Sequence, residues 1–307
     1  MDLIDVLGAN PAWQRNVACA ALLPGEVVRL RKGADGAAGK GFNCAQALRT
    51  HGRRVRLISG VGTDRSDWET ACRDADLELA EFPLSGPVRR ATTVRDLSNG
   101  SVTELVEEGP SVAEGAERIL AALLGERDSI PLCACGTLAA GLDPGMVAGI
   151  LRGRSGPLVV DSLPLIRALL PLGERSAPTC LKLNESEWTS LGLGEGVDSA
   201  WSGIRRTWSR VALVCTRGAK GSVGEDPSSV RIEVPAIPLD GGEEVHPIGA
   251  GDAYTAGFAH VWCFGGGFAE ALRAGAATAR ASCLDPLPSR FSRVDYEQSL
   301  ARFDGSR

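Results

Sequence analysis

Short apolar runs alternate along the chain with segments whose apolar residues recur at helical spacing. The runs LVVDS and VALVCT contain no alternating polar positions, which is typical of strands buried on both faces. We expect strands at Leu3–Leu7, Val55–Ser59, Leu132–Cys135, Leu158–Asp161, Cys180–Leu183 and Val211–Cys215. We expect helices at Gly39–His51, Trp68–Ala75, Val112–Leu124, Pro144–Leu151, Glu185–Leu191, Ala200–Trp208, Ala250–Cys263 and Phe268–Cys283. This order predicts an α/β fold with a mostly parallel central sheet and helices on both faces.

Two stretches interrupt this alternation because they are β-biased and contain no helical pattern. They are Pro11–Lys32 and Arg89–Val106, and Asn99-Gly100 in the second is a hairpin signal. We expect these stretches to pair into a small β-sheet lid. The domain prediction is therefore a main α/β domain over residues 1–10, 33–88 and 107–307, with a lid over residues 11–32 and 89–106.

Composition and charge narrow the function classes. The 307 residues carry a formal net charge of −5, which argues against nucleic acid held by bulk electrostatics. No apolar run approaches the roughly 20 residues of a membrane helix, and MDLIDVLGANP lacks the pattern of a secretory signal. The 9 cysteines include no CxxC pair, and the 3 histidines show no metal-ligand spacing. We therefore expect a cytoplasmic protein with no membrane or nucleic-acid partner.

The segment HPIGAGDAYTAGF is the most informative for chemistry. Gly249 and Gly251 allow a tight turn that gathers backbone N–H groups, and an Ala-rich helix follows at once. The N-terminus of that helix is a natural anion site. Asp252 in its first turn is placed to accept a proton from a hydroxyl that attacks a bound phosphate. The alternative is that Asp252 merely caps the helix.

Three further segments follow predicted strands or open a predicted helix. GAAGKGFN is a near miss to a P-loop, because Gly41 stands where Ser or Thr is needed, yet it suits a sugar or its phosphate. KLNESE places Asn184 and Glu187 on one helix face, where they could hold Mg²⁺ through water or simply start a helix. TRGAKG could hold nucleotide phosphates or simply enter a hairpin.

Together these segments resemble the ribokinase-like (PfkB-type) carbohydrate kinase family over almost the whole chain. NPAWQ resembles the family's NPAxD, GAAGKGFN its GGKGxN, CGTLAAG its GSLPxG, KLNESE its KPNxxE, TRGAKG its SxGxxG and PIGAGD its GAGD. TELVEEGP resembles a segment of the 1-phosphofructokinase and tagatose-6-phosphate kinase branch. The resemblance implies transfer of the γ-phosphoryl group of ATP to a sugar hydroxyl, with Mg²⁺.

The resemblance also implies roles for individual residues. It makes Asp252 the catalytic base, and the amides of Gly249, Ala250 and Gly251 the anion hole. The implied ATP-binding residues are Lys182, Asn184, Thr216, Gly218 and Gly221, and the implied Mg²⁺ positions are Asn184 and Glu187. The implied substrate-binding residues are Gln14, Gly39, Lys40, Asn43 and Thr137, with Arg29 and Arg90 for a substrate that already carries a phosphate. The alternative for the two arginines is surface solubility.

Four positions depart from the family pattern. Gln14 replaces an Asp that accepts hydrogen bonds from sugar hydroxyls, so it bears on sugar preference. Ala38 replaces the first glycine of the sugar loop, and Ala139 and Leu183 replace prolines. None removes the catalytic constellation.

The leading hypothesis is a hexose-phosphate kinase that resembles 1-phosphofructokinase, 6-phosphofructokinase or tagatose-6-phosphate kinase. One alternative is a kinase for an unphosphorylated sugar or nucleoside. The other is a catalytically idle sugar-phosphate sensor. A homodimer formed through the lid is a further expectation from the resemblance.

Overall fold

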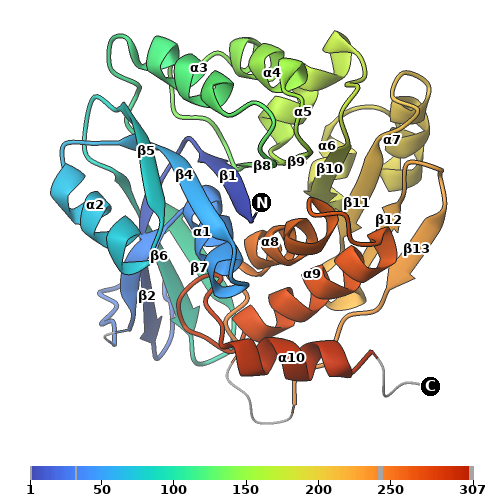
Figure 1. Ribbon diagram of the computed structural model, residues 1–307. Helices are drawn as coiled ribbons and strands as arrows, with labels where there is room; N and C mark the ends of the chain where they lie inside the picture. Colours follow the sequence, from blue (N-terminus) through green and yellow to red (C-terminus); the bar gives the residue numbers. More distant parts are fainter. Residues whose placement is uncertain (1, 32, 241–244, 304–307) are drawn as a thin grey trace.

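The computed structural model describes residues 2–31, 33–240 and 245–303, and a nine-stranded sheet forms its centre (Figure 1). The strand order is β13-β12-β11-β10-β9-β8-β1-β4-β5. Neighbours from β11 to β5 pair in parallel, and β12 and β13 add an antiparallel edge. The strands are β1 (Leu3–Gly8), β4 (Arg54–Val61), β5 (Glu78–Pro83), β8 (Leu132–Cys135), β9 (Leu158–Asp161), β10 (Thr179–Asn184), β11 (Ala212–Thr216), β12 (Ser222–Glu225) and β13 (Arg231–Val234). The expected mostly parallel α/β sheet is confirmed.

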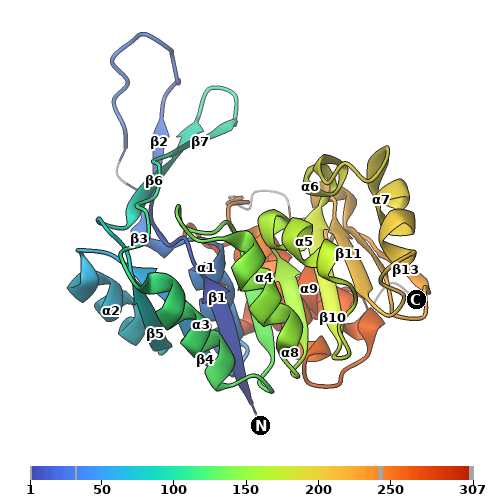
Figure 2. The ribbon, with the colours of Figure 1, turned by 90° about the horizontal axis from the view of Figure 1, so that it is seen from above.

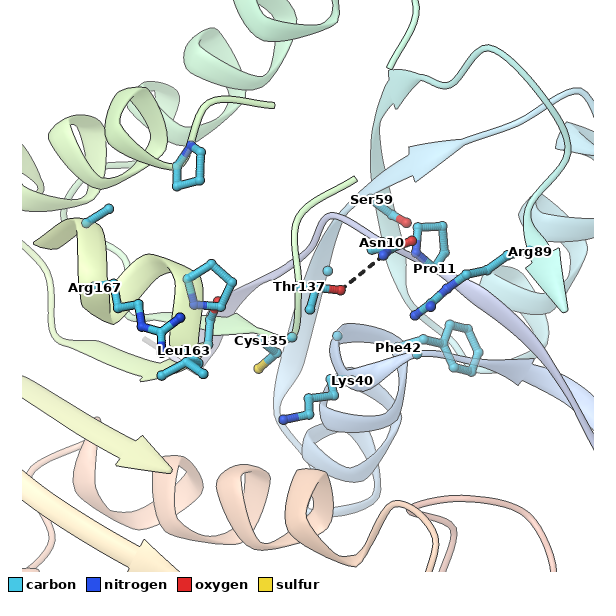
Figure 3. A pocket seen from close by; sticks show the side chains of 18 of the residues that line it. Asn10, Pro11, Lys40, Phe42, Ser59, Arg89, Cys135, Thr137, Leu163 and Arg167 are labelled. Atoms are coloured by element: carbon cyan, nitrogen blue, oxygen red, sulfur yellow. Dashed lines mark hydrogen bonds between the residues drawn. The ribbon is translucent and has the colours of Figure 1, made fainter. Parts of the chain in front are cut away.

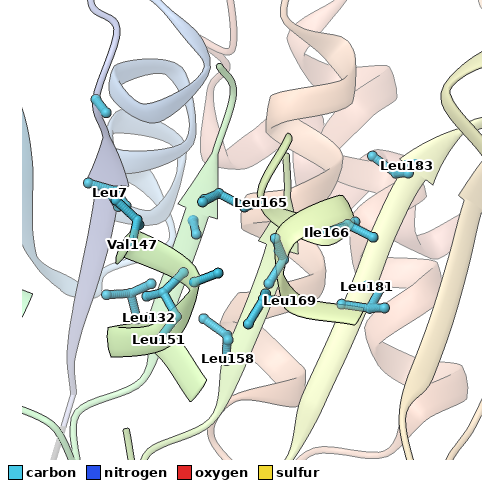
Figure 4. Packing of buried hydrophobic residues seen from close by; sticks show 14 of the residues in the cluster. Leu7, Leu132, Val147, Leu151, Leu158, Leu165, Ile166, Leu169, Leu181 and Leu183 are labelled. Carbon is cyan, nitrogen blue, oxygen red and sulfur yellow. The ribbon is translucent and has the colours of Figure 1, made fainter. Parts of the chain in front are cut away.

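Helices cover both faces of this sheet and form two apolar cores. One core lies under α1 (Lys40–Thr50), α2 (Arg65–Asp74), α8 (Ala250–Trp262) and α9 (Phe268–Ser282). The other lies under α3 (Ala116–Glu126), α4 (Pro144–Gly153), α5 (Leu163–Leu169) and α7 (Gly196–Arg205). Figure 4 shows its leucine-rich centre, where Leu132, Leu151 and Leu169 are fully buried. Each such side chain contributes about 1.5–3 kcal/mol by leaving water.

A separate four-stranded sheet, here called the small sheet, projects from this body (Figure 2). Its order is β3-β2-β6-β7, from β3 (Asp35–Ala38), β2 (Ala12–Cys19), β6 (Arg89–Asp96) and β7 (Val102–Val106). The Asn99-Gly100 hairpin joins β6 to β7 as expected, with Gly100 at φ 75°. The expected composition of the small sheet needs one correction, because its strand β3 comes from residues 33–88, which were assigned to the main domain. It pairs antiparallel with β2 and extends the small sheet toward α1.

Several elements were not expected from the sequence. They are β5, β12, β13, α5, the 3₁₀ segments Leu170–Leu172 and Gly218–Lys220, and α10 (Arg293–Ala301). The helix expected from Val112 begins only at Ala116, because Val112 bridges to Leu84 in an extended conformation. These edge strands and short helices have weak patterns of their own and are stabilised by neighbours distant in sequence. None of the helices in the described ranges is long and apolar enough to cross a membrane.

The parallel strands all end at one edge of the large sheet, which brings several polar segments together. Cys135 at the end of β8 pairs with Asp161 at the end of β9. Asn184 at the end of β10 pairs with Thr216 at the end of β11. The carboxyl ends of strands are where open α/β sheets bind ligands. Chemistry is therefore expected at this edge, beside the small sheet.

Candidate active site

Asp252 occupies the first turn of α8 and lies deep in the molecule. Gly249 precedes the helix at φ 83°, a left-handed conformation that favours glycine, and a Cβ there would lie 2.7 Å from Pro288 Cβ. The Asp252 side chain accepts a hydrogen bond from Asn43 Nδ2 at 2.8 Å. Burial raises the pKa of Asp252 to about 6, although the Lys40 ammonium opposes this rise. The carboxylate is thus a moderately strong base near neutral pH.

The backbone beside Asp252 presents N–H groups to one point. Among the described residues, the N–H groups of Gly249 and Gly251 have no hydrogen-bond acceptor, whereas that of Ala250 donates to Pro247 O at 3.2 Å. The helix dipole of α8 adds positive character at the same end. The arrangement suits an anion, with Gly249 and Gly251 rather than Ala250 as the available donors.

Lys182 supports this turn from behind. Its Nζ donates to Asp161 Oδ2 at 2.8 Å and to Gly251 O at 3.1 Å, and the side chain is buried. Burial alone would raise the pKa of Asp161, but the ammonium groups of Lys182 and Lys40 hold it below its usual value. Lys182 was expected to bind ATP. In the structure its ammonium donates to the buried Asp161 carboxylate and to the glycine turn, and its role toward ATP stays a prediction.

Lys40 reaches the other side of Asp161 from the start of α1. Its Nζ lies 3.6 Å from Asp161 Oδ1 and 3.2 Å from Glu187 Oε1. The charge of Asp161, with Asp252 and Glu187, raises the pKa of Lys40 despite partial burial. Lys40 therefore stays cationic, between the residues expected to bind sugar and those expected to organise a metal.

Asn184 and Glu187 form a capping box at the start of α6 (Glu185–Ser190). The Asn184 side chain accepts from Glu187 N at 2.9 Å, and Glu187 Oε2 accepts from Asn184 N at 3.0 Å. The Asn184 side chain is thus occupied by the helix start. Glu187 Oε1 faces Lys40, on a side chain that is 23% exposed.

These residues can be tested against a magnesium ion. No group of three His, Cys, Asp or Glu within residues 2–31, 33–240 and 245–303 could hold a metal directly. Mg²⁺ commonly keeps several waters and binds one or two carboxylates together with substrate phosphates. Glu187 Oε1, on a partly exposed side chain, fits that mode of binding.

A cavity of about 500 Å³ lies beside the glycine turn, and its floor is formed by the segment after β11. Thr216, Gly218, Gly221 and Asn184 line it, which brings together four of the residues that the resemblance assigns to nucleotide binding. Gly221 has φ 83°, and a Cβ there would lie 2.2 Å from Val234 O. The remaining lining was missed from the sequence and is mainly small or apolar: Ala236, Ile237, Leu239, Val245, Pro247, Tyr254, Ala276, Ala279, Arg280 and Cys283.

A second, larger cavity of about 830 Å³ lies between the small sheet, α1 and α5 (Figure 3). Gly39, Lys40 and Thr137, which the resemblance assigns to substrate binding, line it together. Asn10, which was not singled out, donates to Thr137 Oγ1 at 3.0 Å across the cavity wall. The cavity has the size and the mixed polar lining of a small-molecule site.

Gln14 lies in β2 and is held inside the small sheet. Its Nε2 donates to Thr93 Oγ1 at 2.7 Å and to Asn16 Oδ1 at 3.3 Å. A family Asp at this position would offer only acceptors, whereas the Gln14 amide donates to Thr93 on the neighbouring strand β6 and to Asn16 on its own strand.

The structure places the arginines of the small sheet differently from the expectation. Arg89 lines the larger cavity and points into it in Figure 3. Arg90 follows it in β6 and points to the opposite face, because successive strand side chains alternate. Arg29 lies exposed in the loop after β2. Within one chain, neither Arg29 nor Arg90 lines this cavity. Arg89 was missed from the sequence, although the dipeptide Arg89-Arg90 at the start of the strand was a signal that could have identified it.

Arg89 has the character of an anion-binding residue. Its Nε is buried and has no hydrogen-bond partner among the described residues. Burial lowers the pKa of its guanidinium, and Glu104 only partly offsets this. The group stays charged at neutral pH, so an anion in the cavity would satisfy both its charge and its free donor.

Several solved structures are similar to this chain over nearly its whole length. Solved structures similar to it include phosphofructokinase-2 from Escherichia coli in complex with substrates and products, with TM-score 0.86, 20% identity, and coverage of 98% of this chain and 99% of that one. Another is a possible 1-phosphofructokinase from Thermotoga maritima, with TM-score 0.80, 17% identity and 97% coverage of both chains. A third is ribokinase from Arabidopsis thaliana complexed with ribose and ATP, with TM-score 0.71, 18% identity, and coverage of 97% and 98%.

At these identities the solved structures establish the ribokinase-like fold. No curated protein matches the chain. The family model described as pfkB family carbohydrate kinase matches residues 2–292, which is nearly the whole chain. The chain therefore belongs to the pfkB family of carbohydrate kinases and is an ATP-dependent carbohydrate kinase.

Proposed function

We propose that this enzyme transfers the γ-phosphoryl group of ATP to a hydroxyl of a hexose phosphate. The observation that carries the proposal is the buried, unpaired Nε of Arg89 beside the larger cavity. A substrate phosphate is the anion that a planar guanidinium binds best. Fructose 6-phosphate is the first candidate, since phosphofructokinase-2 from Escherichia coli has been solved with it. Fructose 1-phosphate and tagatose 6-phosphate are the next two.

The proposed mechanism uses Asp252 as the base and the glycine turn as the anion site. The sugar lies in the larger cavity with its reacting hydroxyl toward Asp252, which accepts the hydroxyl proton as the oxygen attacks. The amides of Gly249 and Gly251, with the dipole of α8, stabilise charge on the transferred phosphoryl group. Lys40 supplies a cation between the two cavities. When bound, Mg²⁺ would neutralise nucleotide phosphate charge, and Glu187 would hold it through water, because the Asn184 side-chain oxygen is already used in the capping box.

The proposal is tested by ADP release from Mg-ATP with fructose 6-phosphate, fructose 1-phosphate, tagatose 6-phosphate and free hexoses or nucleosides. Turnover on one phosphosugar above the others is the expected result. Turnover on free sugars or nucleosides only would favour the unphosphorylated-substrate kinase. Sugar-phosphate binding without any turnover would favour the sensor, which has no need for a raised-pKa base at Asp252.

The pH profile follows from the raised pKa of Asp252. Only the carboxylate form accepts a proton, so kcat/KM should fall about tenfold per pH unit below about pH 6. Since Lys40 lowers this pKa, Lys40→Met should move the acidic limb to higher pH as well as reduce the rate. Initial rates between pH 5 and 8.5 measure both effects. A flat profile down to pH 5 would contradict the role of Asp252.

We also propose a homodimer formed through the outer face of the small sheet. Val17, Cys19 and Val94 form a buried cluster there, with Leu22 and Val28 packed against it. Around this cluster Leu30, Leu105 and Val106 are 45%, 57% and 48% exposed. A contiguous apolar surface of this kind favours a self-complementary contact. One similar protein, phosphofructokinase-2 from Escherichia coli, has a tetrameric inhibited form.

The dimer is checked by sedimentation velocity. Leu105→Glu should shift the chain to monomer, whereas Leu172→Glu, on a 39% exposed leucine far from the small sheet, should not. A monomeric wild type, or equal behaviour of the two variants, would remove this proposal.

As an ATP-consuming enzyme with 9 free cysteines, the protein is proposed to act in the reducing cytoplasm.

A further inference from the structure

Two arginines from the C-terminal part of the chain fasten the loop that covers the smaller cavity. This loop runs from residue 235, after β13, to Asp240, and it contributes Ala236, Ile237 and Leu239 to the cavity wall. Arg280 on α9 donates from Nε to Pro238 O at 3.1 Å and from Nη2 to Asp240 Oδ2 at 3.3 Å. The Arg280 side chain is only 5% exposed, so these bonds are largely shielded from water.

Arg302, which ends α10, binds the same two acceptors. It donates from Nη1 to Pro238 O at 3.3 Å and from Nη2 to Asp240 Oδ2 at 2.5 Å. Arg280 Nη1 also donates to Ser299 Oγ on α10 at 3.3 Å. Figure 1 shows α10 lying across α9, so the loop, α9 and the end of α10 are joined in one network.

This network connects two walls of the cavity. Ala276, Ala279 and Cys283 form the α9 wall, and the loop residues form the other wall. Because both walls are small or apolar, they offer shape rather than hydrogen bonds to a planar base. The separation of the walls therefore governs the contact area, and the bonds to Pro238 and Asp240 fix that separation.

We propose that Asp240 and Arg302 are positioning residues for the nucleotide, through which the docking of α10 sets nucleotide affinity. The inference rests on the proposed function only in taking this cavity as the nucleotide site. Neither residue lines the cavity, so each acts through the loop. The Asp240 and Arg302 side chains are 58% and 38% exposed, so the expected effect is moderate.

The experiment compares Asp240→Asn and Arg302→Ala with Arg293→Ala. The control arginine is on the same helix, and its side chain is 71% exposed and paired with Glu297. ADP affinity is measured by calorimetry, together with KM for ATP, KM for the sugar substrate, kcat at saturating ATP, and Tm. We expect ADP affinity and KM for ATP to weaken roughly 5- to 20-fold in both test variants. The other parameters should stay within about twofold, and Arg302→Lys should recover part of the loss.

The outcomes separate this inference from a general structural role and from the proposed reaction. Unchanged ADP affinity, or equal shifts in the ATP and sugar parameters, would overturn it. If Arg302→Ala fails to fold, Asp240→Asn decides the matter, because it preserves side-chain size and only removes the charge. ADP binding needs no phosphoryl transfer. A wild type that binds ADP but phosphorylates no sugar would refute the proposed function. The ADP affinities of the variants would still test whether Asp240 and Arg302 position the nucleotide.

Discussion

Asp252→Asn is expected to lower kcat by roughly 10²- to 10⁴-fold while ADP affinity stays close to that of the wild type. The substitution removes the proton acceptor but preserves the shape of the side chain. Its amide oxygen can still accept the hydrogen bond from Asn43 Nδ2, which the carboxylate accepts at 2.8 Å. The first turn of α8 and its free N–H groups should therefore persist, and nucleotide binding should persist with them.

The measurement is ADP release at saturating ATP and sugar, with calorimetric ADP binding as the companion readout. Asp74→Asn, an exposed carboxylate at the end of α2, serves as the control and should be unchanged. A turnover of Asp252→Asn within a few fold of wild type would remove Asp252 as the base. A parallel loss of ADP binding would instead show that the substitution disrupts the turn.

Arg89→Ala is expected to cost about 2–4 kcal/mol of transition-state binding on a phosphosugar, or roughly 30- to 1,000-fold in kcat/KM. The reason is that the substrate phosphate would lose its bond to the half-buried Arg89 guanidinium. No other described residue accepts a hydrogen bond from Arg89 Nε, so this group is available for the phosphate. Arg90→Ala is the matched control, since it removes the same group one position later in β6, on the opposite face. Its effect should stay within about threefold.

Steady-state kinetics on the preferred phosphosugar and on the matching free sugar distinguish the outcomes. Arg89→Ala should lose activity only on the phosphosugar, because the free sugar carries no charge for it to bind. If Arg90→Ala proves the more damaging variant, the substrate phosphate must be reached from the outer face, as it could be across the proposed dimer. If neither variant discriminates, neither arginine binds the substrate phosphate, and the proposed role of Arg89 is wrong.

Much of the fold was predictable because it follows from local patterns. The buried strands β8 and β9 were predicted with the same bounds that the structure has, since a short apolar run between turn signals leaves few alternatives. The glycine turn before α8 was equally predictable, because the left-handed conformation at Gly249 favours glycine. Edge strands such as β5 and β13 were not predicted from the sequence, since their hydrophobic patterns are weak and the neighbouring strands supply their stability.

Within the site, the sequence determines which chemical groups are present and in what order: a carboxylate at a helix start, glycine turns after strands, and a lysine at the start of α1. The tertiary structure decided what each group faces. The register of β6 against β2 turns Arg89 rather than Arg90 toward the cavity. Lys182 pairs with Asp161, and Arg302 pairs with Asp240, although the two residues of each pair are distant in sequence. The rise of the pKa of Asp252 above its usual value also comes mainly from burial. Burial, like strand register, depends on contacts between distant segments, which local sequence does not encode.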